Sequence, residues 1–249
     1  MAGQDHKSAQ PLILAVDTSS RQTGLALRRG QEAARSVTIL SDEKRSEKLW
    51  VDIESLLAES AVTINDVELF GVCVGPGSFT GLRVGMSAMK GLAAATGKPI
   101  IGVTSLEAAA SLARPCDVVC ALVNAHKSEV YSQLFSIDDE GVPVALNAPL
   151  VSTLVKALER TEGQHKVVFA GTEALDYGER SGIERGRVME HTSQSLAVEV
   201  GRLSYLKFAR GEFGTAESLR ACYVRPAEAE VKLSLGLLGS KIKRSLKPG

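Results

Sequence analysis

Gly75-Pro-Gly-Ser-Phe-Thr-Gly-Leu-Arg83 is the most unusual stretch of this 249-residue sequence. It follows an apolar run at 67–74, which predicts a buried strand, and it opens a small, apolar segment, which predicts a helix over about 78–96. Glycine permits positive φ and close backbone approach, and the free N–H groups of a helix N-terminus favour anions. The stretch therefore predicts a tight strand-to-helix connection, with anion binding as the sharper alternative.

Asp17-Thr-Ser19 is a second polar stretch, directly after the apolar run at 12–16 that predicts the first strand. A carboxylate and hydroxyls at a strand end are able to hold a hydrated magnesium ion and a phosphate. They are also typical of a turn that short polar side chains cap. Both interpretations stay open. One is a capped turn. The other is a nucleotide or anion site with contacts at Asp17, Thr18, Ser19, Gly77 and Ser78.

A helix is predicted over 42–60, because Ser41 precedes a charged first turn and apolar residues then recur at helical spacing. The apolar residues on one face are Leu49, Ile53, Leu56 and Leu57. Packing in the core is the simplest interpretation of this stripe. Trp50, the single tryptophan, lies at the edge of the stripe and indicates an interface anchor.

The order of the predicted elements favours two α/β lobes. Short strands at 12–16, 23–27 and 33–40 predict an antiparallel meander, and strands then alternate with helices. Thr104-Ser-Leu-Glu107 fits a capping box at the start of a further helix. The second half repeats this order and ends with a helix predicted over 193–210. We expect a first lobe at 1–112, a smaller second lobe at 113–228 and a flexible basic tail at 229–249.

Composition argues against several classes of protein. Lys+Arg and Asp+Glu both number 29, so the net charge is zero, which argues against a strongly basic nucleic-acid binder. No apolar run reaches the roughly 20 residues that span a bilayer, and residues 1–10 do not resemble a signal peptide. We therefore expect a cytoplasmic protein without membrane contact.

Cysteines and histidines give no pattern for a metal site. Cys73, Cys116, Cys120 and Cys222 contain no CxxC pair and are expected to be free thiols. No two of the four histidines lie three or four residues apart, so a helical metal-binding pair is absent from the sequence. We expect no metal site, and the spacing of serines, histidines and aspartates indicates no nucleophilic triad.

Three stretches together resemble the TsaB (YeaZ) family of bacterial tRNA-modification subunits: Ile13-Leu-Ala-Val-Asp-Thr-Ser19, Val74 to Gly85, and Lys90-Gly-Leu-Ala93. Two further stretches are similar to the family's second-lobe strand pair and C-terminal motif. They are Asn124-Ala-His-Lys-Ser-Glu-Val-Tyr131 and Tyr223-Val-Arg225. The sequence departs from the family pattern at Asn124 and His126, where the family often has Asp and usually has Arg.

The resemblance implies an α/β, actin/Hsp70/sugar-kinase-like fold of two lobes with a reduced second lobe. It implies a non-catalytic subunit that pairs with TsaD in threonylcarbamoyl transfer to adenosine of tRNA. The implied partners are a TsaD-like subunit, a TsaE-like ATPase, a second copy in a homodimer, and tRNA indirectly through the complex. No tightly bound cofactor is implied, and ATP or ADP with magnesium is expected only in the multi-subunit complex.

The family's partner surface corresponds to the helices predicted over 42–60 and 78–96. The residues expected to form it are Leu49, Trp50, Ile53, Leu57, Gly81, Gly85, Met86 and Met89.

An ATP-dependent phosphotransferase of the same fold is the alternative, with Asp17 and the Gly75 loop on the nucleotide. Such an enzyme needs a second phosphate loop and an adenosine pocket in the second lobe. The sequence has no glycine motif for either one. The subunit role is therefore favoured.

Overall fold

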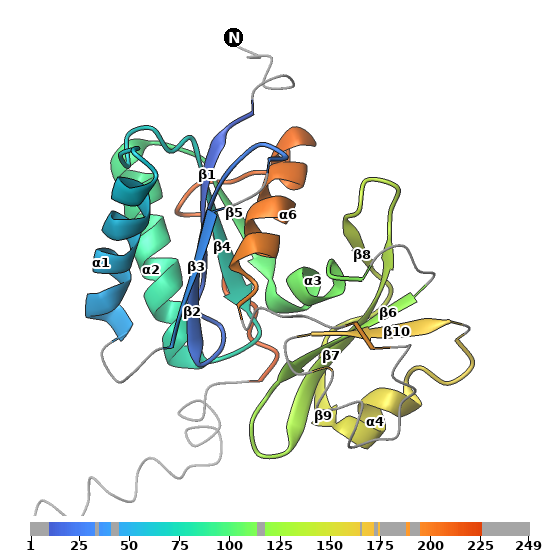
Figure 1. Cartoon of the computed structure of the whole chain (residues 1–249). Helices are drawn as coiled ribbons and strands as arrows, with labels where there is room; N and C mark the ends of the chain where they lie inside the picture. The colour runs from blue at the N-terminus through green and yellow to red at the C-terminus, as the bar shows by residue number, and fades with distance from the viewer. Residues whose placement is uncertain are drawn as a thin grey trace, which may run out of the picture.

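The computed structural model describes residues 10–32, 35–40, 45–113, 118–164, 166–171, 174, 188–189 and 195–225, without the side chains of 36–40 and 45–47. Two lobes lie side by side, and each is built on its own sheet (Figure 1). The predicted tail at 229–249 and Cys116 lie outside the described residues.

The first sheet has the strand order β3-β2-β1-β4-β5. These strands are β3 (Arg35–Leu40), β2 (Gln22–Arg29), β1 (Leu12–Asp17), β4 (Leu69–Gly75) and β5 (Ile100–Thr104). Strands β1, β2 and β3 pair antiparallel, whereas β4 and β5 continue the sheet in parallel with β1. The predicted antiparallel meander is confirmed.

Helices cover both faces of this sheet (Figure 1). Helices α1 (Arg45–Glu59) and α2 (Phe79–Thr96) lie on one face, and α6 (Ala197–Ala209) lies on the other. The alternation of side chains along β1 explains both layers. Leu14 and Val16 pack in the cluster of α1 and α2, whereas Ile13 and Ala15 pack in the cluster of α6.

The second sheet has the strand order β10-β6-β7-β8, and β9 also pairs with β7. Its strands are β6 (Val118–Asn124), β7 (Glu129–Ile137), β8 (Pro143–Ala145), β9 (Leu150–Thr153) and β10 (Val167–Ala170). Helix α4 (Leu154–Glu159) packs on one face through Ala157. The short helix α3 (Ser105–Ala110) lies between the lobes. The capping box is confirmed, since Thr104 Oγ1 accepts from Glu107 N at 3.0 Å and Glu107 Oε2 accepts from Thr104 N at 2.7 Å.

The expected lobe boundaries are wrong for the C-terminal part of the described chain. Helix α6 packs on the first sheet, because Gly201 lets it approach β1: a Cβ at that position would lie 3.2 Å from the Ala15 side chain. Residues after α6 also return to the first lobe. Gly214 and Ile100 exchange backbone hydrogen bonds of 3.1 Å, and Cys222 N donates to Val74 O at 2.8 Å.

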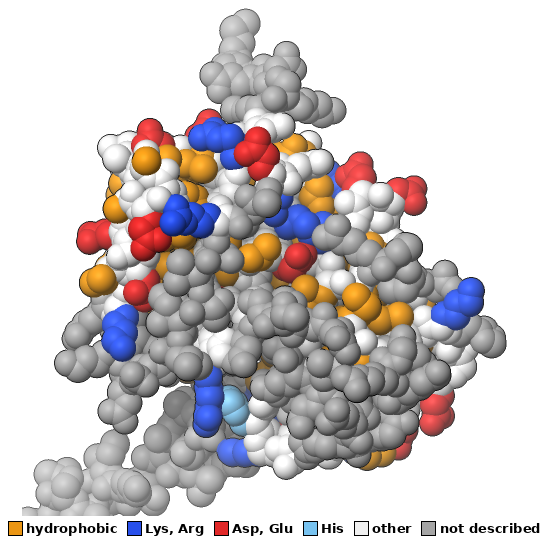
Figure 2. Space-filling view, in the orientation of Figure 1, with side chains coloured by type: hydrophobic (Ala, Val, Ile, Leu, Met, Phe, Trp, Pro, Cys, Tyr) orange, Lys and Arg blue, Asp and Glu red, His pale blue; other side chains and the backbone are white. Residues whose placement is uncertain are grey.

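Ion pairs join α6 to the turn between β7 and β8. Arg210 pairs with Asp138 at 2.8 Å and with Glu140 at 2.6 Å. Acidic and basic side chains are interspersed over the face drawn in Figure 2, as the zero net charge suggests. No helix in the described part of the chain combines the length and the apolar composition that crossing a membrane requires.

Candidate functional site

The glycine-rich loop lies directly on the turn that ends β1. Ser78 N donates to Ser19 O at 2.6 Å, and Ser78 Oγ caps α2 by accepting from Gly81 N at 3.3 Å. Gly77 has φ +159°, and a Cβ there would lie 2.3 Å from Ser19 O. Only glycine fits such a contact, so the loop joins strand to helix as the sequence predicts.

Asp17 is surrounded by hydrogen-bond donors from the chain itself. Its side chain is buried, with the residue 1% exposed. Oδ1 accepts from Ser19 N at 2.9 Å and from Ser19 Oγ at 2.6 Å, and Oδ2 accepts from Leu196 N at 3.0 Å. The carboxylate therefore fixes the start of α6 against the end of β1. These hydrogen bonds are those of a turn that short polar side chains cap, as one of the two interpretations predicts.

Thr18 lies beneath α2. Its Oγ1 is buried and has no hydrogen-bond partner among the described residues. A Cβ on Gly85 would lie 2.2 Å from this oxygen, so Gly85 is required by a contact within the lobe. The structure thus brings the five candidate nucleotide contacts together, and Asp17, Ser19 and Ser78 make hydrogen bonds within the lobe, whereas Thr18 Oγ1 has no partner among the described residues.

A cavity of about 460 Å³ lies between the lobes. It is lined by the loop at 76–78, by the β6–β7 turn with His126 and Lys127, and by residues 222–225. Arg225 donates to Glu129 and to Ala125 O, which holds the end of the described chain to the second lobe.

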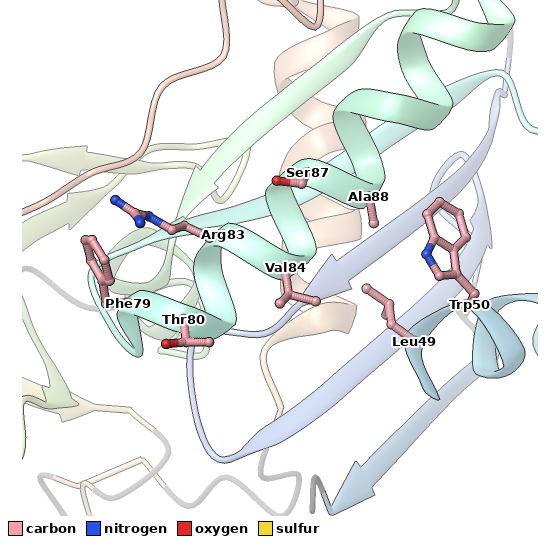
Figure 3. Close-up of a pocket in the computed structure, with 8 residues that line it drawn as sticks. All are labelled: Leu49, Trp50, Phe79, Thr80, Arg83, Val84, Ser87 and Ala88. Atoms are coloured by element: carbon pink, nitrogen blue, oxygen red, sulfur yellow. The ribbon is translucent and has the colours of Figure 1, made fainter. Parts of the chain in front are cut away.

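A shallow groove of about 550 Å³ lies between α1 and α2 (Figure 3). Its lining residues are Leu49, Trp50, Phe79, Thr80, Arg83, Val84, Ser87 and Ala88. Trp50 is 44% exposed and lies at one end, while Phe79 and Arg83 lie at the other. We call this feature the α1–α2 groove.

Arg83 and Phe79 form the end of the groove that lies opposite Trp50. The Arg83 guanidinium lies over the Phe79 ring, 3.9 Å from its centroid. The Phe79 ring in turn contacts Tyr223, with 5.2 Å between centroids. Tyr223, one of the motif residues near the C-terminus, therefore supports the first turn of α2.

Most residues predicted to form the partner surface do not face outward. The buried ones are Leu49, Ile53, Leu57, Gly81, Gly85, Met86 and Met89. Their burial confirms core packing as the interpretation of the stripe on α1, although Leu49 also lines the edge of the α1–α2 groove. Trp50 is the exception, and the helix pair as a partner surface stays a prediction.

The sequence reasoning missed the outward side of α2. Thr80, Val84, Ser87 and Gly91 recur at helical spacing on this side. Gly91 is exposed, and no atom of the described residues would lie within 4 Å of a Cβ placed there. The spacing was visible in the sequence, but the more apolar inner stripe masked it.

Three of the four cysteines lie in the described part of the chain. Cys73, Cys120 and Cys222 are free thiols, as predicted. Burial raises the pKa of Cys73 well above its usual value and that of Cys120 to about 12, so both thiols are neutral. Within the described ranges, no three His, Cys, Asp or Glu side chains gather as a metal site requires.

Comparison with known proteins gives consistent matches. The family model described as tRNA N6-adenosine threonylcarbamoyltransferase, TsaD, matches residues 40–170, which is more than half of the chain. The tRNA threonylcarbamoyladenosine biosynthesis protein TsaB of Escherichia coli is 26% identical over 230 residues, covering 89% of this chain and 97% of that protein. The Bacillus subtilis TsaB protein is 32% identical over 124 residues, which cover 49% of this chain and 54% of that one.

A solved structure agrees over nearly its full length. The YeaZ structure from Pseudomonas aeruginosa has a TM-score of 0.71 and 26% identity, covering 86% of this chain and 99% of that chain. The expected α/β, actin/Hsp70/sugar-kinase-like fold is confirmed by these matches together with the two-lobed architecture.

Proposed function

The chain belongs to the TsaB (YeaZ) family, and on this premise we propose that it is a non-catalytic subunit of tRNA threonylcarbamoyladenosine biosynthesis. In this role it pairs with a TsaD-type transferase subunit in the cytoplasm and supports threonylcarbamoyl transfer to adenosine of tRNA. A TsaE-type ATPase completes the assembly, and tRNA is reached through the complex.

The engagement of Asp17 is the observation that most supports a role without chemistry of its own. A carboxylate that coordinates magnesium needs oxygen lone pairs directed at the ion or its water shell. Here both carboxylate oxygens accept hydrogen bonds from Ser19 and Leu196. Freeing them would leave buried donors unpaired, at about 1–3 kcal/mol for each group. The phosphotransferase alternative is therefore disfavoured.

The α1–α2 groove supports the pairing. Trp50 is exposed at the end of the groove, and tryptophan is enriched among the residues that dominate binding energy at protein interfaces. Trp50 and the outward side of α2 therefore supply a surface for a partner subunit.

Reconstitution tests the proposal. The purified chain is combined with the transferase and ATPase subunits from the same genome, a threonylcarbamoyl donor and tRNA, and the modified nucleoside is measured by mass spectrometry. Modification is expected only when the chain is present. The chain alone is expected to hydrolyse no ATP.

Two variants separate the interpretations. Trp50→Ala should reduce modification at limiting protein, because it weakens pairing. Turnover of ATP by the isolated chain, abolished by Asp17→Asn in a folded variant, would instead support the phosphotransferase.

A further inference from the structure

The outer edge of the second sheet has no partner strand in the described part of the chain. Strands β8 and β9 both pair with the side of β7 that lies opposite β6. Together they form one edge over residues 143–153, since Leu146 N continues the ladder by donating to Leu134 O at 2.8 Å. Alternate backbone N–H and C=O groups of such an edge point away from the sheet, where a further strand is able to bind them.

This edge also carries exposed apolar side chains. Val144, Leu146 and Leu150 are 48%, 51% and 42% exposed. The register places Val144 opposite Ser136 and Leu150 opposite Ser132, on the face of β7 whose other side chains pack in the cluster of α4. Helix α4 therefore covers only part of this face, and the side chains along the edge lack an apolar partner.

We propose that residues 231–237 of the same chain add to this edge as a further strand, antiparallel to β8 and β9. The stretch reads Val231-Lys-Leu-Ser-Leu-Gly-Leu237, so apolar residues alternate strictly with polar or small ones. Strict alternation is the pattern of a strand with one buried face. The apolar face of the added strand would pack over Val144 and Leu150, and this part of the expected flexible tail would be ordered.

The last described residue lies beside the end of this edge at which the added strand would begin. Arg225 donates to Glu129, and Glu129 is the register partner of Thr153, the last residue of β9. Five residues, 226–230, connect Arg225 to the proposed strand. An extended chain covers about 3.3 Å for each residue, so the five span roughly 16 Å, whereas neighbouring strands lie about 4.8 Å apart. The segment therefore reaches the edge beside Thr153 and runs towards Pro143, which is the antiparallel direction.

The charges at the far end of the edge are complementary to those that follow the segment. The turn at 138–140, just before β8, has three carboxylates, and Arg210 forms ion pairs with two of them. The basic residues after the proposed strand are Lys241, Lys243, Arg244 and Lys247. Residues 231–241 are as many as the edge residues 143–153, so a segment that starts beside Thr153 brings these cations to the acidic turn. A segment of the same chain also has a high effective concentration at the edge, which favours it over a second copy.

Hydrogen exchange of the full-length chain, followed by mass spectrometry of its peptides, tests the inference. In wild type, amides over 231–237 should exchange at least about tenfold more slowly than in an unstructured chain, because paired amides must open before they exchange. Leu235→Asp puts a charge on the apolar face of the segment and should remove this protection, both over 231–237 and at the outward amides of 143–153. Ser234→Asp is the matched control, because it adds the same charge one residue away on the opposite face. It should leave exchange over both ranges within about twofold of wild type.

Leu150→Asp makes the reciprocal test from the edge. Leu150 is partly exposed, so circular dichroism should show the variant folded. It should speed exchange over 231–237, as Leu235→Asp speeds it over 143–153. Unchanged exchange over 231–237 in folded Leu150→Asp would overturn the inference.

Three other results would also overturn it. In the first, residues 231–237 of wild type exchange as fast as an unstructured chain. In the second, Ser234→Asp and Leu235→Asp change exchange equally, so the alternation of the segment does not matter. In the third, protection over 143–153 rises with protein concentration and survives Leu235→Asp, so a second copy covers the edge. None of these results bears on the proposed function, which depends on a different surface.

Discussion

The inner and outer sides of α2 differ in the contacts that their residues make. On the inner side, the polar residues at the end of β1 and in the glycine-rich loop bond to one another, and Gly85 accommodates Thr18. On the outer side, Trp50 and Arg83 frame a groove, and Gly91 has open space among the described residues. The stretch that most resembles a ligand site is thus held mainly by contacts within the lobe, whereas the α1–α2 groove is exposed. Substitutions on the two sides should accordingly differ in sign and size.

Ile53→Asp should have the largest effect. Ile53 is 2% exposed in the cluster between the helix pair and the sheet, so the variant buries an unpaired charge. We expect a loss of about 3–5 kcal/mol in the free energy of unfolding. Urea denaturation followed by circular dichroism measures it. Trp50→Ala, on the outer side of the same helix, should change stability by less than about 1 kcal/mol; equal losses would contradict the distinction.

Asp17→Ala should lower the free energy of unfolding nearly as much as Ile53→Asp. It leaves the buried N–H of Leu196 and the Ser19 groups without their acceptor. We expect a loss of about 2–4 kcal/mol, because bonds to a charged acceptor are stronger than neutral ones. Asp66→Ala is the control, since Asp66 accepts similarly from Thr63 in an exposed turn. Its cost should be under about 1 kcal/mol in the same denaturation experiment.

Gly85→Ala should destabilise the first lobe. The new Cβ would lie 2.2 Å from Thr18 Oγ1, so one of the two residues must shift. Overpacking of this kind costs about 1–3 kcal/mol. A double-mutant cycle with Thr18→Ala checks the cause. The double variant should lose less than the sum of the single losses, and strict additivity would rule out the contact.

Gly91→Ala should stabilise the first lobe, in contrast to Gly85→Ala. Alanine favours helix over glycine, and no described atom opposes the added methyl group. We expect a gain of about 0.5–1 kcal/mol in the free energy of unfolding, together with weaker binding of the transferase subunit. Calorimetric unfolding and binding, measured on one preparation, separate the two effects. A loss of stability would mean that the position is not open.

The partly exposed ion pairs between the end of α6 and the second lobe should contribute least to the free energy of unfolding. Burial raises the pKa of Asp138, but hydrogen bonds from Val142 N–H and Arg210 outweigh it and lower the pKa below its usual value. The stabilisation is therefore present above the unfolded pKa of about 4 and is lost as pH falls through the folded value. Because the pair is partly exposed, we expect less than about 1 kcal/mol. The free energy of unfolding should differ less between pH 3 and pH 7 in Asp138→Asn than in wild type. An unchanged difference would show that Asp138 does not contribute this pH dependence.

Local patterns predicted most of the fold. The meander, the strand–loop–helix at 67–96 and the capping box at Thr104 all follow from short stretches whose periodicity or turn chemistry is decided by near neighbours. The helix at 197–209 was also predicted, but its placement in the second lobe was wrong. An apolar stripe shows which side of a helix is buried and not which sheet buries it.

At the candidate site, too, some features follow from local sequence patterns and others from tertiary packing. The sequence by itself determined that 75–83 joins a strand to a helix, because an apolar strand-like run precedes this stretch and a helical pattern follows it. It also singled out Trp50 beside a buried stripe. Only the tertiary structure decided that Leu196 N donates to Asp17, that Thr18 fills the space at Gly85, and that Gly91 faces outward. These outcomes depend on partners up to 179 positions away along the chain, and packing between such distant segments leaves no local pattern from which to predict it.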